Sequence, residues 1–460
     1  MTRTDPATGA PGPRHASPPA RPSGLRADLV TVGAALAFLA AALVVGVELH
    51  ARDVPVLAAS APFLAYWEPH VGWGTPLAVL AAAGVVTAGP PVAARMAWGR
   101  LLGAAYLTAL AWAVSLALSR DWYGIVGPPG RHEDYLTDVP DAPPVAEILA
   151  TFTERIAGSH PENWITHVAG HPPGAYLTYV GLDRVGLGGP AWAAATDVLV
   201  GVAAVPAIAL AVRSLAGEAW ARLALPFLVL FPGAVFVAVS ADAIFLAVTA
   251  WGFALLALAT GARGRRHDVQ AAGAGLLFGL GLFLSYGVVL LGLPVLALLW
   301  LRQRPRTLVL SGLPVVAVVG VFAAYGFVWW EGYQALVPRY YAGWGGDRPY
   351  AYWVWANLAV QVAVIGPAAC AGLRRMLAGR HGGSGKAPPG LVVLLAGMLV
   401  VVAAATLSGM SKAETERIWL PFTAWFVVAC AALPVRHHRG WLTVQVATAL
   451  AVEHLMVSSW

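Results

Sequence analysis

Charged residues and cysteines are scarce in this chain. Only 11% of its 460 residues are charged, whereas 58% are hydrophobic, and two are cysteines. So little charge cannot cover the surface of a water-soluble domain of this size. Cys370 and Cys430 both fall in apolar stretches, which leaves a disulfide framework and a cysteine-built metal site without support.

The sequence also lacks the glycine-rich motifs that bind nucleotides. It contains neither a Walker-type Gly-Lys-Ser/Thr loop nor a Gly-rich strand-to-helix turn, which argues against a soluble nucleotide-dependent catalytic domain. The net charge of +6 does not indicate nucleic-acid binding, because the basic residues gather at the ends of apolar stretches. In membrane proteins such residues mark the cytoplasmic side. We therefore expect no nucleic-acid partner.

Long apolar runs recur from residue 29 to the last residue, and the mean hydropathy is +0.69. Runs of roughly 17 to 25 residues are long enough to cross the hydrocarbon core as helices, which satisfy all their backbone hydrogen bonds internally. The sequence predicts an all-α polytopic membrane protein with about 13 transmembrane helices. We expect them at 29–48, 75–94, 101–119, 190–212, 219–238, 243–260, 269–284, 287–301, 307–328, 352–373, 389–407, 418–434 and 440–458.

The distribution of arginine predicts the orientation of this bundle. Residues 1–28 are rich in Pro, Gly and Arg, which is typical of a disordered tail, and residues 29–460 form one transmembrane domain. Thirteen crossings put the N-terminus and the clusters "RGRR" and "RQRPR" in the cytoplasm. This register requires that 171–189 does not cross. We expect it to be a helix that lies in the interface and begins at its Pro-Pro pair.

The acidic residues then gather at the outer face of the cell membrane. The external loop 120–189 contains "RHEDYLTDVPDAPP" and "HVAGHPPGAYL", and a hairpin tip contains Asp242. The external loop 329–351 is rich in Trp and Tyr, and "SKAETERIWL" brings Lys412 and Arg417 to the end of a helix. Carboxylates of this kind can take a proton from a hydroxyl, and cations can neutralise a phosphate leaving group. These are the groups that a transferase acting on a lipid-linked phosphate donor needs.

The order of these motifs resembles the GT-C superfamily of integral-membrane glycosyltransferases, which includes protein O-mannosyltransferases and lipid A aminoarabinose transferases. The resemblance rests on "HEDYL", "HPPGAYL", "SADAIF" and "RPYAYW", and it covers about residues 101–260, with the rest similar only in layout. It implies a polyprenyl-phosphate-linked sugar as donor, an extracytoplasmic glycan, lipid or protein as acceptor, and no cofactor. The implied enzyme is an inverting hexosyl- or pentosyltransferase, for example a mannosyltransferase.

The resemblance also implies roles for individual residues. The acidic residue of the first loop is the catalytic base in the family, which corresponds to Asp134 or Glu133, and the hairpin aspartate corresponds to Asp242 as an orienting or second carboxylate. The Pro-Pro motif places His171 at the donor phosphate. We expect Arg417 to join His171 at the donor phosphate. Lys412, Arg339 and Arg348 are further candidates for phosphate binding, and Tyr135 is another expected substrate contact.

The chain departs from the family pattern at three points. Two extra helices precede the acidic loop, which makes Asp53 and Glu68 a competing acidic site. Gly174 follows the Pro-Pro pair where the family has leucine, and His171 precedes it where a lysine is common. These last two differences bear on how the position before the prolines handles phosphate.

Other interpretations of the same residues stay open. Asp242 is also a normal helix N-cap, the cations at 412 and 417 are also typical of interfacial snorkelling, and the aromatic residues of 329–351 are typical of a membrane belt. His132, His160 and His167 could bind a divalent metal ion together with the carboxylates of the same loop, although their spacing matches no standard metal motif. The alternative function is a transporter or flippase for a lipid-linked or anionic solute, and a third is a non-catalytic scaffold.

Overall fold

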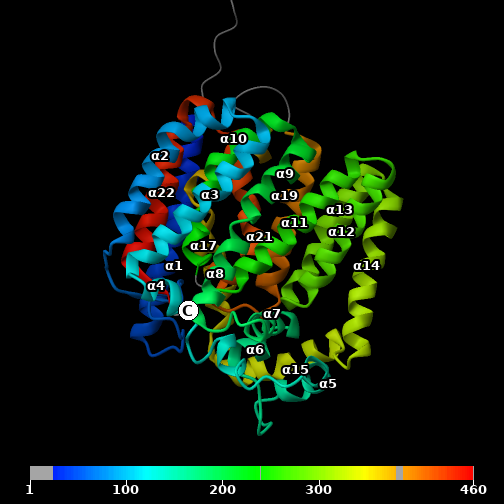
Figure 1. Ribbon diagram of the computed structural model, residues 1–460. Helices are drawn as coiled ribbons and strands as arrows, with labels where there is room; N and C mark the ends of the chain where they lie inside the picture. Colours follow the sequence, from blue (N-terminus) through cyan, green and yellow to red (C-terminus); the bar gives the residue numbers. More distant parts are fainter. Residues whose placement is uncertain (1–23, 239, 380–386, 459–460) are drawn as a thin grey trace, which may run out of the picture.

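A computed structural model describes residues 24–238, 240–379 and 387–458, and these residues are mostly helical. Long helices form a bundle, and a layer of short helices lies across one end of it (Figure 1). Seven helical segments in the described ranges are long and apolar enough to cross a membrane. They are α1 (Leu25–Ala51), α2 (Gly74–Arg95), α3 with η1 (Trp98–Arg120), α8 with α9 (Pro190–Ala216), α11 (Asp242–Gly261), α14 (Pro305–Ala324) and α19 (Pro389–Leu407).

Two further pairs pass the same test only when each is taken as one bent span. Helix α17 (Tyr350–Ile365) meets α18 (Pro367–Leu377) at 103°, and the segment of α21 (Leu420–Thr423) with η6 (Ala424–Ala432) meets that of η7 (Val435–His437) with α22 (His438–Leu455) at 112°. The described chain is therefore a multi-pass membrane protein with seven to nine candidate spans. The predicted thirteen spans are not confirmed.

Fewer candidate spans than predicted are found because several of the remaining helices are short or polar. Helix α10 (Glu218–Val229) has 12 residues and is followed by the separate turn η4 (Pro232–Phe236), and α13 (Gly292–Arg302) has 11 residues after η5 (Tyr286–Leu291). Helix α12 (Gly264–Leu282) has 19 residues but begins with "GRRHD". These elements overlap the predicted spans 219–238, 269–284 and 287–301, yet each is shorter or more polar than the seven segments above.

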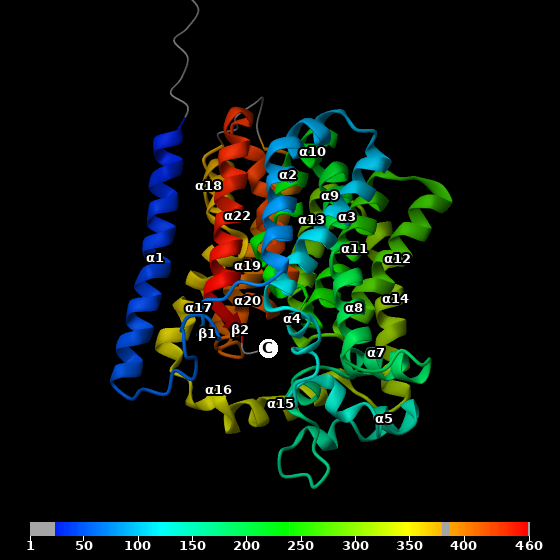
Figure 2. The ribbon, with the colours of Figure 1, turned by 60° about the vertical axis from the view of Figure 1, so that its left-hand side comes forward.

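Helix α1 begins at Leu25, so the predicted tail of 1–28 is too long by four residues, and the part at 1–23 lies outside the described residues. Asp28 is fully buried and pairs with Arg374 and Arg375 of α18. This ion pair fixes the first turn of α1 to the bundle, although α1 otherwise stands at its edge (Figure 2). The pairing explains why helix replaces tail here.

The short helices at the far end come from three parts of the chain. Between α3 and α8 lie α4 (Tyr123–Val126), η2 (Tyr135–Asp138), α5 (Val145–Thr151), η3 (Glu154–Ile156), α6 (Thr166–Gly170) and α7 (Pro173–Arg184). Helices α15 (Trp329–Ala342) and α16 (Trp344–Asp347) run beneath the bundle, and α20 (Thr415–Ile418) follows α19 (Figure 2). Strands β1 (Ala65–Trp67) and β2 (Met456–Ser458) pair antiparallel.

Helix α7 corresponds to the predicted interfacial helix at 171–189. Pro173 is its first residue, where the missing amide proton costs no hydrogen bond, and the helix has 12 residues. Its length of about 18 Å is shorter than the hydrocarbon core. Its Tyr176 and Tyr179 belong to a buried apolar cluster that also contains Trp164 and Phe327. This cluster holds the short helices against the bundle.

Candidate functional site

A single cavity of about 1780 Å³ opens among the short helices. Six of the eight site residues predicted from the sequence line it, and they come from four separate segments. The six are Glu133, Asp134, His171, Arg339, Lys412 and Arg417. The structure therefore brings together residues that lie almost 300 positions apart in the chain.

The other two predicted residues lie behind the cavity wall. Tyr135 is buried, and its ring packs against the rings of His167, His171 and Tyr179. Asp242, at the start of α11, is 2% exposed and is not part of the lining. Neither side chain reaches the cavity, so the predicted substrate contact of Tyr135 and the predicted catalytic role of Asp242 do not fit their positions.

Asp242 instead forms a buried ion pair with Arg417. The Nη1 group of Arg417 donates to Oδ2 of Asp242 at 2.6 Å, and both side chains are at most 5% exposed. Ser240 donates a second hydrogen bond, of 3.2 Å, to the same oxygen. Two buried charges are stable in such surroundings only when they are paired and hydrogen-bonded. Asp242 thus positions the arginine whose guanidinium lies at the cavity wall.

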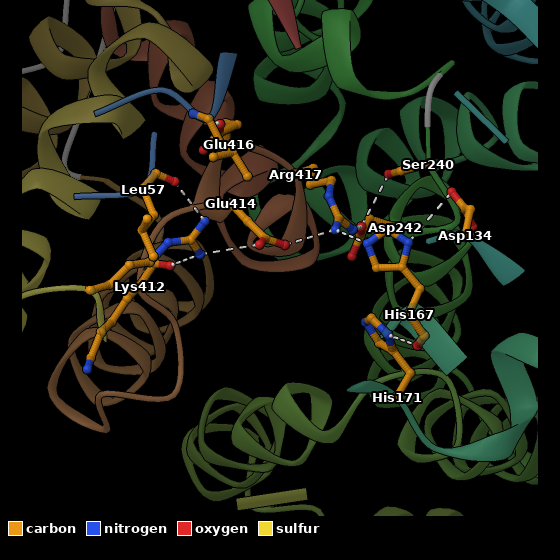
Figure 3. A network of polar contacts seen from close by, with 12 residues as sticks. Leu57, Asp134, His167, His171, Ser240, Asp242, Lys412, Glu414, Glu416 and Arg417 are labelled. Carbon is orange, nitrogen blue, oxygen red and sulfur yellow. Dashed lines mark hydrogen bonds and ion pairs between the residues drawn. The ribbon is translucent and has the colours of Figure 1, made fainter. Parts of the chain in front are cut away.

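Arg417 is the centre of a larger polar network (Figure 3). Its Nη2 group donates to Glu414 Oε2 at 3.0 Å and lies 3.0 Å from His167 Nε2. Burial acts to lower the pKa of Arg417, but the carboxylates of Asp242 and Glu414 outweigh it and raise the pKa above its ordinary value. Its charge is therefore permanent and well compensated.

Asp134 lies on the opposite side of His167 from Arg417. Its Oδ1 accepts a hydrogen bond of 2.6 Å from the backbone N–H of Tyr135, which caps η2, and its Oδ2 lies 3.7 Å from His167 Nδ1. His167 also donates its backbone N–H to the carbonyl of Glu133 at 3.2 Å. These contacts hold the "HEDY" turn against α6 and leave the carboxylate of Asp134 at the cavity wall.

His171 follows α6 and turns inward. Its Nδ1 lies 2.9 Å from the carbonyl oxygen of His167, so the tautomer with the proton on Nδ1 suits this contact. Burial lowers the pKa of His171, which favours the neutral ring at pH 7. A neutral imidazole presents no charge to a phosphate, which weakens the predicted phosphate role of this residue.

The segment 411–417 is held in an unusual conformation. Ala413 and Glu414 both have positive φ angles, of 69° and 66°, which cost residues other than glycine about 1 kcal/mol or more each. Asn357 of α17 accepts from Ala413 N at 3.2 Å and donates to the carbonyl of Ser411, and Gln361 donates to the carbonyl of Thr415 at 2.9 Å. These two buried amides fix the strained turn that carries Lys412 and Arg417.

Glu414 and Glu416 in this turn have opposite environments. Burial acts to raise the pKa of Glu414, but the guanidiniums of Arg417 and Arg348 lower it below the usual value. Glu416 points away from the cavity, accepts a hydrogen bond of 2.8 Å from Leu64 N, and has its pKa raised to about 7 by burial. The first is a permanent carboxylate of the wall, whereas the second ties the loop after α1 to α20.

Arg339 has a structural role beside its place in the lining. It donates hydrogen bonds to the carbonyls of Ile156 and Trp164, at 3.0 and 2.8 Å, and to the side chain of Asn163 at 3.2 Å. These bonds hold the external loop against α15. Of the competing acidic pair, Asp53 lines the same cavity as Asp134, whereas Glu68 is exposed and outside it.

No protein-family model matches the chain, and no curated protein matches it. The site is therefore characterised by its own geometry. Within the described residues, no group of three or more His, Cys, Asp and Glu side chains is arranged to hold a metal ion. His132 is exposed, His160 is half-buried, and neither lines the cavity, so they do not join His167 in a cluster.

Sequence reasoning did not assign His167, Asn357 and Gln361 to this network, and treated the first only as a metal ligand. Asn357 and Gln361 carried a signal, because they are polar residues four positions apart in the apolar run "YAYWVWANLAVQVAVI". Such residues in a transmembrane helix normally meet a polar partner, here the backbone of 411–415. Nothing in the local sequence pairs His167 with Arg417.

Proposed function

We propose that this protein is a GT-C-like membrane glycosyltransferase, which transfers a sugar from a polyprenyl-phosphate donor to a hydroxyl of an acceptor outside the cytoplasmic membrane. One observation supports it most directly: a single cavity is lined by the acidic pair of Glu133 and Asp134 and by the cations of Arg348, Lys412 and Arg417. A base and a set of cations facing one space are what transfer from a phosphate leaving group requires.

Asp134 is the general base in this mechanism. It removes the proton of the acceptor hydroxyl while that oxygen attacks the anomeric carbon of the donor sugar. The bond between the anomeric carbon and the phosphate oxygen breaks, the leaving phosphate keeps the electron pair, and the configuration of the sugar inverts. The proton ends on the Asp134 carboxyl, and basic side chains at the wall neutralise the charge that develops on the phosphate. No redox or nucleotide cofactor takes part.

The apolar part of the cavity suits the lipid chain of the donor. Trp329, Trp330 and Tyr333 of α15 line it together with Leu290 and Phe422. Stacked and tilted aromatic rings of this kind offer faces both to isoprene units and to sugars. The donor thus enters with its head group toward the charged wall and its chain along the aromatic one.

The proposal also specifies which side of the membrane the cavity faces. Helices α15 and α16, whose residues line the cavity, lie at the end of the bundle opposite the N-terminal end of α1 (Figure 2). Arg374 and Arg375 pair with Asp28 at that N-terminal end of α1. Arginine-rich ends face the cytoplasm in most membrane proteins, so the cavity faces outward. Donor and acceptor therefore meet at the extracytoplasmic surface of the cell membrane.

The test is sugar transfer by the purified protein in liposomes, with a radiolabelled polyprenyl-phosphate sugar and an extract of envelope acceptors. Asp134→Asn should lower transfer by at least about 100-fold, because a general base contributes about that much or more. Glu147→Gln, which alters an exposed acid of the same loop on α5, is the matched control and should leave transfer unchanged.

Two results would contradict the proposal. Asp134→Asn with undiminished transfer would exclude this residue as the base. Movement of the intact donor across the bilayer, without cleavage of the sugar–phosphate bond and without loss in Asp134→Asn, would favour the transporter or flippase instead.

A further inference from the structure

The five basic side chains that line the cavity differ in how their charges are compensated. They are Arg131, Arg339, Arg348, Lys412 and Arg417. Arg417 contacts two carboxylates, of which one is buried beside it. A cation already neutralised in this way gains little from a further anion, because the incoming charge is repelled by the resident ones.

Lys412 has the opposite surroundings. Its side chain is 7% exposed, its Nζ donates to the carbonyl of Gly345 at 2.6 Å, and it lies 5.3 Å from the centre of the Tyr341 ring. No ion pair joins Lys412 to a carboxylate among the described residues. Burial and the nearby charge of Arg348 lower the pKa of Lys412. A buried ammonium with only neutral partners is costly, and a bound anion would relieve that cost.

Arg348 contacts the backbone of Lys412 and is only partly compensated. It is 3% exposed, and it donates to the carbonyls of Lys412 and Leu57 at 2.7 and 3.2 Å. Its one carboxylate contact, with Glu414, is long at 3.4 Å and is shared with Arg417. Its buried Nε has no acceptor within the described residues. In the described part of the chain, Lys412 thus has no carboxylate partner, and Arg348 has only a share of Glu414.

Neutral donors complete the surroundings of this pair. Tyr340 accepts a hydrogen bond of 3.1 Å from Lys412 N and lines the cavity, so its own hydroxyl proton can be donated to a ligand. Trp344 and Gly345 of α16 line the same part of the wall. The excess positive charge of the cavity is therefore localised where α15 and α16 meet the 411–417 turn.

We propose that Lys412 and Arg348 form the subsite for the phosphoryl group of the ligand, and that Arg417 is a positioning residue rather than a phosphate contact. This inference rests on the proposed function for the nature of the phosphoryl compound, a prenyl monophosphate. It departs from the expectation that Arg417 and His171 bind the phosphate. The ligand's phosphate replaces the carboxylate that Lys412 lacks.

The experiment compares binding of farnesyl phosphate and farnesol to the full-length protein in phosphatidylcholine nanodiscs. The wild type should bind the phosphate about tenfold or more tightly than the alcohol, and Lys412→Gln should lose most of that preference. Lys412→Arg, which keeps the charge, should retain it. The double variant Asp242→Asn/Arg417→Gln removes a buried pair as a neutral unit and should also retain it.

A second measurement uses the wild type alone. The chain has two lysines, Lys386 and Lys412, so an amine-reactive reagent followed by peptide mass spectrometry reports on each. Farnesyl phosphate should slow the labelling of Lys412 by about tenfold at saturation, with farnesol and Lys386 as references. Equal labelling of Lys412 with both compounds would overturn the proposal. So would a double variant that loses phosphate preference as fully as Lys412→Gln. Sugar transfer enters neither measurement, so a failure of the proposed enzyme activity gives a separate result.

Discussion

The guanidinium of Arg417 lies 3.0 Å from Nε2 of His167, and this contact determines which nitrogen of the imidazole carries a proton. Arginine can only donate, so Nε2 must accept, and the proton of a neutral ring lies on Nδ1. That nitrogen lies 3.7 Å from Oδ2 of Asp134. The buried pair of Asp242 and Arg417 thereby orients His167, and through it the proposed base.

This relationship predicts the tautomer of His167. In the full-length protein with ¹⁵N-labelled histidine, the ring of His167 at pH 7.5 should show a protonated Nδ1 and an unprotonated Nε2. The signal is identified by its loss in His167→Asn. A protonated Nε2 would show that Arg417 does not donate to this ring.

The buried Asp242–Arg417 pair predicts that mutations of these two residues do not have additive effects on the free energy of unfolding. Asp242→Ala should destabilise the protein by about 3–5 kcal/mol, because it leaves a buried guanidinium with less compensation. The double variant Asp242→Asn/Arg417→Gln should cost clearly less than the sum of the single changes. Thermal unfolding in detergent measures both. Additive losses would indicate that the two side chains do not interact.

The raised pKa of Glu416 predicts that the stability of the protein depends on pH. Its pKa is raised to about 7 by burial, so between its unfolded pKa, near 4.5, and pH 7 the folded protein holds a proton that the unfolded chain releases. The stability contributed by Glu416 is full below pH 4.5 and is lost as the pH rises to 7. The stability lost across this range is about 3 kcal/mol, at roughly 1.4 kcal/mol for each pH unit.

The matched variant for this prediction is Glu416→Gln, which keeps an acceptor for Leu64 N and does not titrate. Relative to the wild type, it should gain stability steadily from pH 4.5 to 7 and remain level above that range. Unfolding midpoints measured across this interval test the prediction. Parallel curves for the two proteins would show that Glu416 does not titrate there.

Gly174 predicts a steric penalty where the chain departs from the family pattern. A Cβ at this position would lie 2.5 Å from the carbonyl oxygen of Phe283, to which Gly174 N also donates at 2.8 Å. Gly174→Ala should therefore destabilise the protein by about 1–3 kcal/mol. Gly181→Ala, in the same helix with open space around it, should be neutral or stabilising. A fully tolerated Gly174→Ala would show that α7 does not approach Phe283 this closely.

Part of the candidate site could be predicted from the sequence. Asp134 and His171 were selected because their motifs resemble those of GT-C enzymes, and Lys412 and Arg417 because cations are conspicuous at the end of an apolar helix; all four line one cavity. The all-α, multi-pass architecture followed from the apolar runs, which need only local composition to recognise.

The pairing of Asp242 with Arg417 and the number of spans could not be predicted in this way. That Asp242 faces Arg417 depends on how α11 meets α20, 175 positions along the chain, and no local pattern encodes it. The number of spans predicted from hydropathy is not confirmed, because hydropathy does not separate a continuous helix from one broken at Phe231. The antiparallel pairing of the short strands at 65–67 and 456–458 was likewise not predicted from the sequence.

The attachment of the 411–417 turn to α17 connects the cavity wall to the far end of the bundle. Asn357 and Gln361 hold this turn, and α17 ends before Gly366, where the chain bends by 103° into α18. Helix α18 in turn anchors the first turn of α1 through Asp28. The turn that carries Lys412 and Arg417 and the buried ion pair at the start of α1 therefore belong to one continuous chain of contacts.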